Sequence, residues 1–406
     1  MEILQKDLAQ KAKNDSMDFA RLIAPVTPLE FDENFFENKH FHLARNNKDY
    51  YKSILTISDL ERILYEQTPR FPSVRLTNAR EDVPADKYVN GDKVNTSSLL
   101  KHFAEGSTIV MSGLHEYHSG LGELVSHLSK TFYHKFQTNV YITPKSSQGF
   151  KVHYDTHDVF VLQIQGKKTW KVYGENPLTL PNKMQEFEPG KYEHGPMIEE
   201  LELRAGDILY IPRGVMHQAE TDDELSIHVT LGWLGFTWTD LIVESVLEYS
   251  KKNAELRKFL PHKMLRRGVN EVDKDHLKNI LSDITENFGL QESVNRFKRE
   301  MAISQKPNIS KLLSNGDLVN KISSQTELSV RKNILYFIKR KEGSIILEWL
   351  GKEVEFPDYT AEAIEYISKT KDVFYIADIP DCLDDEGKIV LIKRLIKEGL
   401  VQIEII

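Results

Sequence analysis

The chain of 406 residues has one cysteine, Cys382, so an internal disulfide and a cysteine-based zinc or iron–sulfur site are both excluded. This scarcity indicates a reducing compartment, and we expect a cytoplasmic protein. The first residues, Met1–Asp15, lack the apolar core of a signal peptide, and no run approaches the roughly 18 apolar residues of a membrane-spanning helix. We therefore expect neither a leader nor a membrane segment.

Positive charge is also scarce, since 53 Lys and Arg face 61 Asp and Glu, a formal net charge of −8. This balance provides no general attraction for nucleic acid or an anionic membrane, and it favours a basic partner. The content of 40% hydrophobic and 28% charged residues is typical of a globular protein. The length predicts two or three domains of about 150 residues each.

Short β-branched or aromatic runs, separated by Gly, Pro, Asn and Asp, follow one another between Asn139 and Gly232. This spacing predicts an antiparallel sandwich or barrel. Gly166 and Lys167 suit a two-residue hairpin turn between the second and third runs. The runs are Asn139–Thr143, Val159–Gln165, Thr169–Tyr173, Asp207–Ile211 and Ser226–Leu231.

After Trp238 the apolar residues recur with a helical period, and one stripe, which ends at Gly289, predicts a helix with one buried face. Polar residues from Ser304 to Gln325 predict a connection. A compact α+β module of winged-helix type follows, with helices from about Ala361 to Lys369 and Asp385 to Glu398. We therefore expect three domains, 1–235, 236–325 and 326–406. The stripe consists of Leu277, Ile280, Leu281, Ile284 and Phe288.

The strongest chemical signal is His153-Tyr154-Asp155, just before a predicted strand. On extended backbone, residues i and i+2 point to the same face, so His153 and Asp155 can converge on one ion. His217 follows the strand Asp207–Ile211 and is a candidate third ligand. Two imidazoles and one carboxylate form a face that leaves positions open on Fe(II). An isolated H-x-D tripeptide would more often be a chance surface match.

This tripeptide is not isolated, because Lys168 and Trp170 follow on the next predicted strand and share one of its faces. A cation aimed into an apolar barrel needs an anionic partner. A dicarboxylate cosubstrate would supply that partner.

Together these motifs resemble one family over nearly the whole chain: the JmjC ribosomal oxygenases of the cupin superfamily, which are Fe(II)- and 2-oxoglutarate-dependent protein hydroxylases. The opening Leu22–Phe31 and Phe35–Lys39 is similar to the start of that family. The two core motifs are Asn139–Asp155 with Val159–Trp170, and Gly206–Glu220.

The resemblance implies an α+β chain whose double-stranded β-helix, a cupin or JmjC jelly roll, precedes a helical dimerisation region and a winged helix. It makes His153, Asp155 and His217 the iron ligands, with 2-oxoglutarate and O₂ as cosubstrates. It also places Lys168 and Tyr141 on the distal carboxylate of 2-oxoglutarate, and Asn139 in the lining of the site.

One position departs from the family pattern. Eukaryotic members have a serine after the last strand motif, which is His228–Leu231 here, and that serine helps to bind the cosubstrate. This chain has Gly232 instead. The lysine can still form an ion pair with the cosubstrate and the tyrosine hydroxyl can still donate a directional hydrogen bond to it, so we expect the pocket to function.

The other candidate residues have simpler interpretations. His115 and His118 are more typical of surface or supporting positions, because a complete triad exists elsewhere. Ordinary strand or loop positions are expected for His157, His194 and His228, of which His228 could line the barrel. Core or interface positions are expected for Trp233 and Trp238.

Our main hypothesis is an oxygenase that hydroxylates a His or Arg side chain of a basic protein, with a ribosomal protein as the candidate, and that forms a homodimer. A second hypothesis gives the same iron site a peptide natural product or an N-methyl-lysine. A third is a non-catalytic cupin sensor that regulates transcription. Residues 326–406 contain 12 Lys and Arg against 16 Asp and Glu, which argues against direct nucleic-acid binding.

Overall fold

The computed structural model describes residues 17–404 except 68, 80–82, 306–315, 317 and 333. The described residues form a mixed helix-and-sheet protein of two compact units. The first unit comprises residues 17–234 and the described parts of 306–334 and 362–404, and the second comprises 235–305 and 335–361. Half of the predicted connection Ser304–Gln325, residues 306–315 and 317, lies outside the described residues. Its described part includes the short 3-10 helix η4 (Leu318–Lys321).

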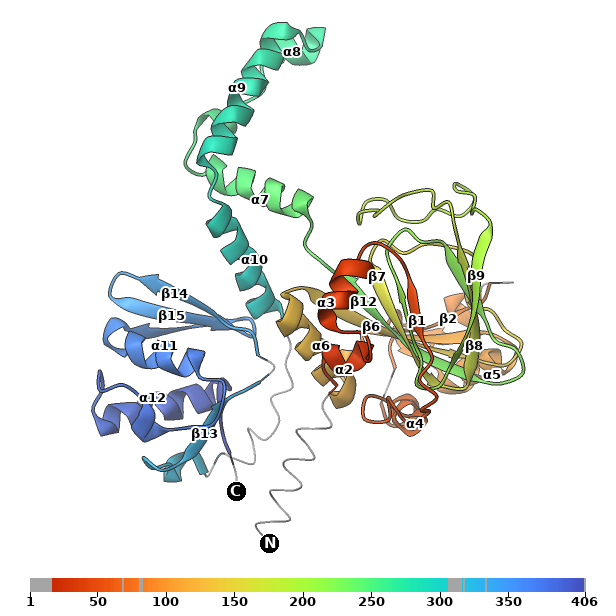
Figure 1. Ribbon diagram of the computed structural model, residues 1–406, viewed down its shortest axis with the longest axis horizontal. Helices are drawn as coiled ribbons and strands as arrows, with labels where there is room; N and C mark the ends of the chain where they lie inside the picture. The colour runs from red at the N-terminus through yellow and green to blue at the C-terminus, as the bar shows by residue number, and fades with distance from the viewer. Residues whose placement is uncertain are drawn as a thin grey trace. The chain divides into compact units, whose positions relative to one another are not determined.

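A seven-stranded antiparallel sheet frames the first unit (Figure 1). It contains four of the five runs that the sequence predicts as strands. In spatial order its strands are β1 (Phe41–Leu43), β10 (Ile208–Ile211), β7 (Asp158–Gln165), β12 (Ser226–Leu234), β6 (Lys135–Thr143), β5 (Thr108–Ser112) and β2 (Val74–Thr77).

Both faces of this sheet are used, because side chains alternate along each strand. On β12, Val229 and Leu231 enter the main hydrophobic core, whereas His228 and Thr230 line a cavity on the opposite face. Helices pack against the core face of the sheet, and the opposite face lines the cavity. These helices are α2 (Phe19–Ile23), α3 (Pro28–Asn34), α4 (Ile57–Glu66), α5 (Thr96–Ala104) and α6 (Ser119–Phe132).

A second sheet, with strands β11 (His217–Glu220), β8 (Lys167–Tyr173) and β9 (Met197–Arg204), contains the remaining predicted run. The hairpin expected at Gly166 and Lys167 is therefore wrong, because β7 and β8 lie in different sheets. Gly166 has φ +65°, and a Cβ there would lie 1.9 Å from the carbonyl oxygen of Leu225. Glycine thus permits the close approach at the corner where the chain changes sheets.

The second unit contains α7 (Trp238–Ser250), α8 (His262–Arg267), α9 (Glu271–Asn287) and α10 (Leu290–Ser304). Capping boxes start α7 and α9, in which the carboxylates of Asp240 and Asp273 each accept a hydrogen bond from the backbone amide of the N-cap residue. Helix α9 ends just before Gly289, as the periodicity predicts. Its predicted buried face is buried only in part in the single chain, since Ile284 is buried whereas Leu277 and Leu281 are 54% and 51% exposed.

A two-stranded sheet of β3 (Val89–Asn90) and β4 (Lys93–Val94) lies in the first unit, and two three-stranded sheets lie towards the C-terminus. One consists of β14 (Phe337–Lys341), β15 (Ser344–Trp349) and β16 (Lys352–Pro357), and the other of β17 (Phe374–Tyr375), β13 (Glu327–Val330) and β18 (Val401–Ile403). Helices α11 (Ala361–Lys369) and α12 (Asp385–Lys397) lie where the sequence predicts them. None of the helices in the described part of the chain is long and apolar enough to cross a membrane.

Candidate active site

His153, Asp155 and His217 lie together, with one ligand atom from each within 4.8 Å of the others. Backbone pairing explains how residues 64 positions apart meet. The amide of His153 donates to the carbonyl of His217 at 3.0 Å, and the reverse bond measures 2.8 Å. Asp155 follows two positions after His153 and approaches His217 with its Oδ2 3.8 Å from Nε2. Among the described residues, this is the only group of three or more His, Cys, Asp or Glu side chains placed to hold a metal ion.

Both imidazoles are already oriented for a metal. The Nδ1 of His153 lies 2.8 Å from the carbonyl oxygen of Lys151, and the Nδ1 of His217 lies 2.9 Å from that of Val215. A carbonyl only accepts, so each Nδ1 carries the proton and each Nε2 keeps its lone pair. This arrangement fixes the tautomer that binds a metal and holds the ring in place.

The electrostatics of the triad favour the same state. Burial and, to a lesser extent, the neighbouring His153 lower the pKa of His217 to about 4, so the ring is neutral at physiological pH. Burial of Asp155 opposes its ionisation, but the surrounding imidazoles hold the pKa of its carboxyl below the usual value. Two imidazoles that present Nε2 and one carboxylate are a donor set that fits Fe(II).

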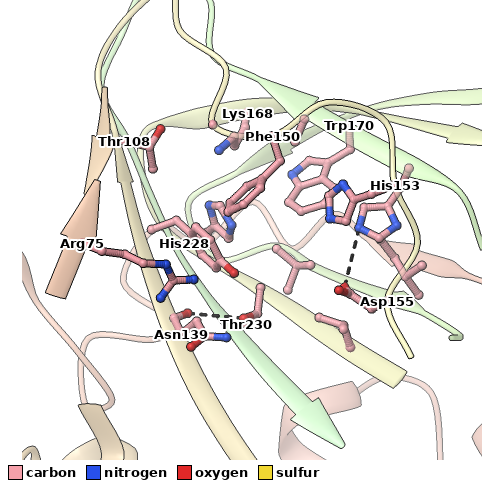
Figure 2. A pocket seen from close by; sticks show the side chains of 17 residues that line it. Arg75, Thr108, Asn139, Phe150, His153, Asp155, Lys168, Trp170, His228 and Thr230 are labelled. Atoms are coloured by element: carbon pink, nitrogen blue, oxygen red, sulfur yellow. Dashed lines mark hydrogen bonds and ion pairs between the residues drawn. The ribbon is translucent and has the colours of Figure 1, made fainter. Parts of the chain in front are cut away.

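The triad borders a cavity of about 280 Å³. Figure 2 shows Lys168 in this cavity, well separated from Asp155, with the ring of Trp170 nearby. Lys168 is 4% exposed, and its Nζ donates to Thr143 Oγ1 at 3.0 Å. Burial lowers the pKa of Lys168 to about 7. The apolar part of the lining comes from Val159, Val161, Phe150, Ile211 and Ala219.

Tyr141 and Asn139, the other two predicted site residues, also line this cavity. They lie two positions apart on β6 and therefore on one face of the sheet. Burial raises the pKa of Tyr141 to about 12, so its hydroxyl stays protonated and able to donate. All six predicted residues thus share a single cavity.

The structure adds lining residues that sequence reasoning missed, among them Arg75 on β2 and Thr108 on β5 (Figure 2). The Nη1 of Arg75 donates to Ser112 Oγ at 2.9 Å. His228, named above as a possible barrel residue, lies parallel to the Tyr141 ring at a centroid distance of 4.7 Å. No sequence motif marks Arg75 or Thr108, because strand pairing alone brings them to the cavity.

Gly232 follows the alternation of His228 and Thr230 on β12, and His157 occupies the space beside it. A Cβ at position 232 would lie 2.7 Å from both Cδ2 and Nε2 of the His157 ring. This contact is closer than Cβ atoms tolerate, so a side chain at 232 requires His157 to move. The glycine at position 232, where the family has a serine, therefore leaves room for the His157 ring.

The remaining candidates are not part of the triad. His115 Nδ1 is 3.1 Å from Thr138 Oγ1, while His118 caps α6 by accepting from the Leu121 amide. His194 lines a wider groove of about 780 Å³ that shares residues with the cavity. Trp233 is buried in the core, whereas Trp238 is 80% exposed.

Comparison with known proteins agrees with this geometry. Residues 123–241 match the JmjC domain family. The chain is 28% identical over 441 residues to a Dictyostelium discoideum "bifunctional lysine-specific demethylase and histidyl-hydroxylase NO66", covering 97% of this chain and 84% of that protein. It is 31% identical over 302 residues to zebrafish (Danio rerio) "ribosomal oxygenase 1", covering 68% of this chain and 53% of that protein. Of the mosquito NO66 proteins it matches, it spans less than half the length.

Among solved structures, the chain is similar to the Escherichia coli ribosomal oxygenase YcfD, with a TM-score of 0.53 and 14% identity. The similarity covers 93% of this chain and 98% of that one, and at this identity it supports the fold alone. The expected cupin or JmjC-like fold is confirmed. The chain therefore carries a JmjC domain and is a homologue of the NO66 and ribosomal oxygenase proteins.

Proposed function

We propose that this protein is an Fe(II)- and 2-oxoglutarate-dependent oxygenase that hydroxylates a His or Arg side chain of a basic protein, a ribosomal protein being the candidate substrate. One observation carries the proposal: a preorganised His153–Asp155–His217 triad shares a cavity with the buried amine of Lys168. The names of the homologues, which include a histidyl-hydroxylase and ribosomal oxygenases, support it.

Each part of the cavity has its own task. His153, Asp155 and His217 would hold the metal through two imidazole nitrogens and a carboxylate oxygen. Lys168 pairs with the distal carboxylate of 2-oxoglutarate, and the Tyr141 hydroxyl donates to the same group. When bound, the iron and 2-oxoglutarate activate dioxygen for insertion of one oxygen atom into the target side chain. Val159, Val161 and Ile211 keep water away from the reacting groups.

The wider groove gives a protein substrate access to the triad. It shares Phe150, His153 and Asp155 with the cavity and continues along Phe187 and Tyr192. A polypeptide in this groove would present one side chain to the metal. The formal net charge of −8 favours a basic polypeptide.

Peptides from basic ribosomal-protein loops, incubated with the full chain, Fe(II), 2-oxoglutarate and O₂, test the proposal. We expect succinate to form and the peptide to gain one oxygen atom, about 16 Da. Asp155→Ala removes the anionic ligand and should abolish both readouts. Oxidation of a peptide natural product or loss of a methyl group from N-methyl-lysine, with ribosomal peptides unmodified, would assign the site to another substrate. Undiminished turnover in Asp155→Ala would place the metal elsewhere.

For the rest of the chain we propose a homodimerisation region within 236–325 and a winged-helix module within 326–406. Apolar side chains of α7 and α9 support the first part, since Ile242, Leu247, Leu277 and Leu281 are each more than half exposed. We place the protein in the cytoplasm because its one cysteine suits a reducing compartment.

A further inference from the structure

The imidazole of His228 is buried beside the cation of Lys168 and has no assigned role. Its side chain is 3% exposed and lines the cavity. The ring lies parallel to Tyr141, with 7° between the planes, and edge-on to Trp170 at a centroid distance of 5.5 Å. These contacts fix the ring in one orientation.

The ring is neutral and one of its nitrogens opens on the cavity. Burial holds the pKa of His228 well below its usual value, and the charge of Lys168 acts in the same direction. Nδ1 is fully enclosed without a hydrogen-bond partner among the described residues. Nε2 is not enclosed in this way and bonds to no described side chain, so Nε2 is the nitrogen that faces the cavity.

The proton of the neutral ring belongs on Nε2. A buried N–H without an acceptor is rarer and more costly than a buried acceptor without a donor. The enclosed Nδ1 therefore keeps its lone pair, and Nε2 presents an N–H to the cavity.

Strand register places this donor near Lys168. His228 pairs with Tyr141 between β12 and β6, and the next pair along the same face is Ser226 with Thr143. Thr143 Oγ1 is the acceptor for Lys168 Nζ. An ammonium has three donors, and among the described residues Lys168 Nζ bonds to Thr143 Oγ1 and to no carboxylate. Lys168 and His228 thus both offer unused donors at one end of the cavity.

We propose that His228 Nε2–H and Lys168 bind the same carboxylate of the cosubstrate, the one remote from the metal triad, so that His228 helps to select a 2-oxo dicarboxylate over a 2-oxo monocarboxylate. The inference rests on the proposed function. It adds a neutral, directional donor to the ion pair, and a charge-assisted hydrogen bond of this kind is stronger than a neutral one.

Calorimetric titration of the Mn(II)-loaded full chain tests the inference without turnover. The probes are 2-oxoglutarate and 2-oxobutyrate, which keeps the chelating 2-oxo acid but lacks the distal carboxylate. In His228→Leu and His228→Asn, we expect the Kd for 2-oxoglutarate to rise about tenfold while that for 2-oxobutyrate stays unchanged. In His228→Gln, whose amide reaches the position of Nε2, we expect most of the wild-type affinity to return.

Gln163→Met is the matched control, because Gln163 pairs with His228 across β7 and β12 and does not line the cavity. Thermal denaturation and Mn(II) binding establish that each variant is folded. The inference is overturned if the His228 variants bind 2-oxoglutarate with the wild-type Kd, or if their Kd for 2-oxobutyrate rises by the same factor. It is also overturned if Gln163→Met raises the Kd for 2-oxoglutarate as much as the His228 variants do. A wild-type protein that binds Mn(II) but not 2-oxoglutarate would instead overturn the proposed function itself, and with it this inference.

Discussion

Lys168 shows at the scale of one residue how burial changes chemistry. A lysine in water has a pKa near 10.4, whereas burial in this cavity lowers the pKa of Lys168 to about 7. The ammonium is therefore only partly populated at neutral pH, until an anion enters. A carboxylate that pairs with it restores the charge.

This shift predicts a pH dependence of cosubstrate binding. A bound carboxylate raises the pKa of Lys168 again, so above pH 7 the complex holds more protons than the free protein. Affinity for 2-oxoglutarate should therefore be highest below pH 7. Above pH 7 the affinity should decrease with rising pH, with a limiting slope of about tenfold for each pH unit. Calorimetry on the Mn(II)-loaded protein from pH 6 to 8.5 measures it. Lys168→Arg, whose guanidinium does not deprotonate, should show a flat profile, and a flat wild-type profile would contradict the prediction.

The contact of Gly232 with His157 predicts a coupled pair. Gly232→Ala places a Cβ 2.7 Å from the ring and should lower the free energy of unfolding by about 1–3 kcal/mol through overpacking. His157→Ala in the same chain removes the obstacle and should restore most of that loss. Urea denaturation of the wild type, both single variants and the double variant gives the coupling energy. Additive effects of the two substitutions would contradict the contact.

At the scale of an element, helix α9 shows that an apolar pattern can predict a helix without predicting which of its residues are buried in the single chain. The period of apolar residues predicts the helix correctly, because amphipathicity is written along a continuous stretch. Ile284 is buried, while Leu277 and Leu281 of the same stripe are exposed in the single chain. The proposed homodimer offers a second copy of the chain as the surface that buries them.

We therefore predict that Leu277→Glu with Leu281→Glu yields a monomer. Burying two carboxylates in an apolar interface would make association less favourable by several kcal/mol. A dimer that loses this much association free energy would dissociate at micromolar concentration. Sedimentation of the wild type and the variant at micromolar concentration measures the change. Lys278→Gln, exposed on the same helix, should leave the dimer intact. A monomeric wild type would contradict the prediction.

At the scale of the whole molecule, the net charge of −8 acts on the rate of encounter. The KM for a basic peptide should rise as salt increases from about 0.1 to 0.5 M, because the screening length shortens from about 10 Å. Turnover at saturating peptide should hardly change, since screening leaves the enclosed site unaffected. Initial rates of succinate formation, with an uncharged peptide of the same target residue as control, measure the effect. Equal salt dependence for both peptides would contradict it.

The sequence by itself determined the strands of the barrel and the local half of the metal site. The β-branched run Ser226–Leu231 and the i, i+2 spacing of His153 and Asp155 are properties of neighbouring residues, so they are readable without a fold. The motifs that resemble the JmjC family also pointed to His217, Lys168, Tyr141 and Asn139, which the structure places around one cavity.

Only the tertiary structure decided how the strands pair. It placed β7 and β8 in different sheets, where the local turn residues at Gly166 indicated a hairpin. It also brought Arg75 and Thr108 to a cavity lined by His228, from strands that are far apart in the sequence. Register between distant strands depends on which faces the assembled core buries, and this information is spread over the whole sheet rather than carried by any one segment.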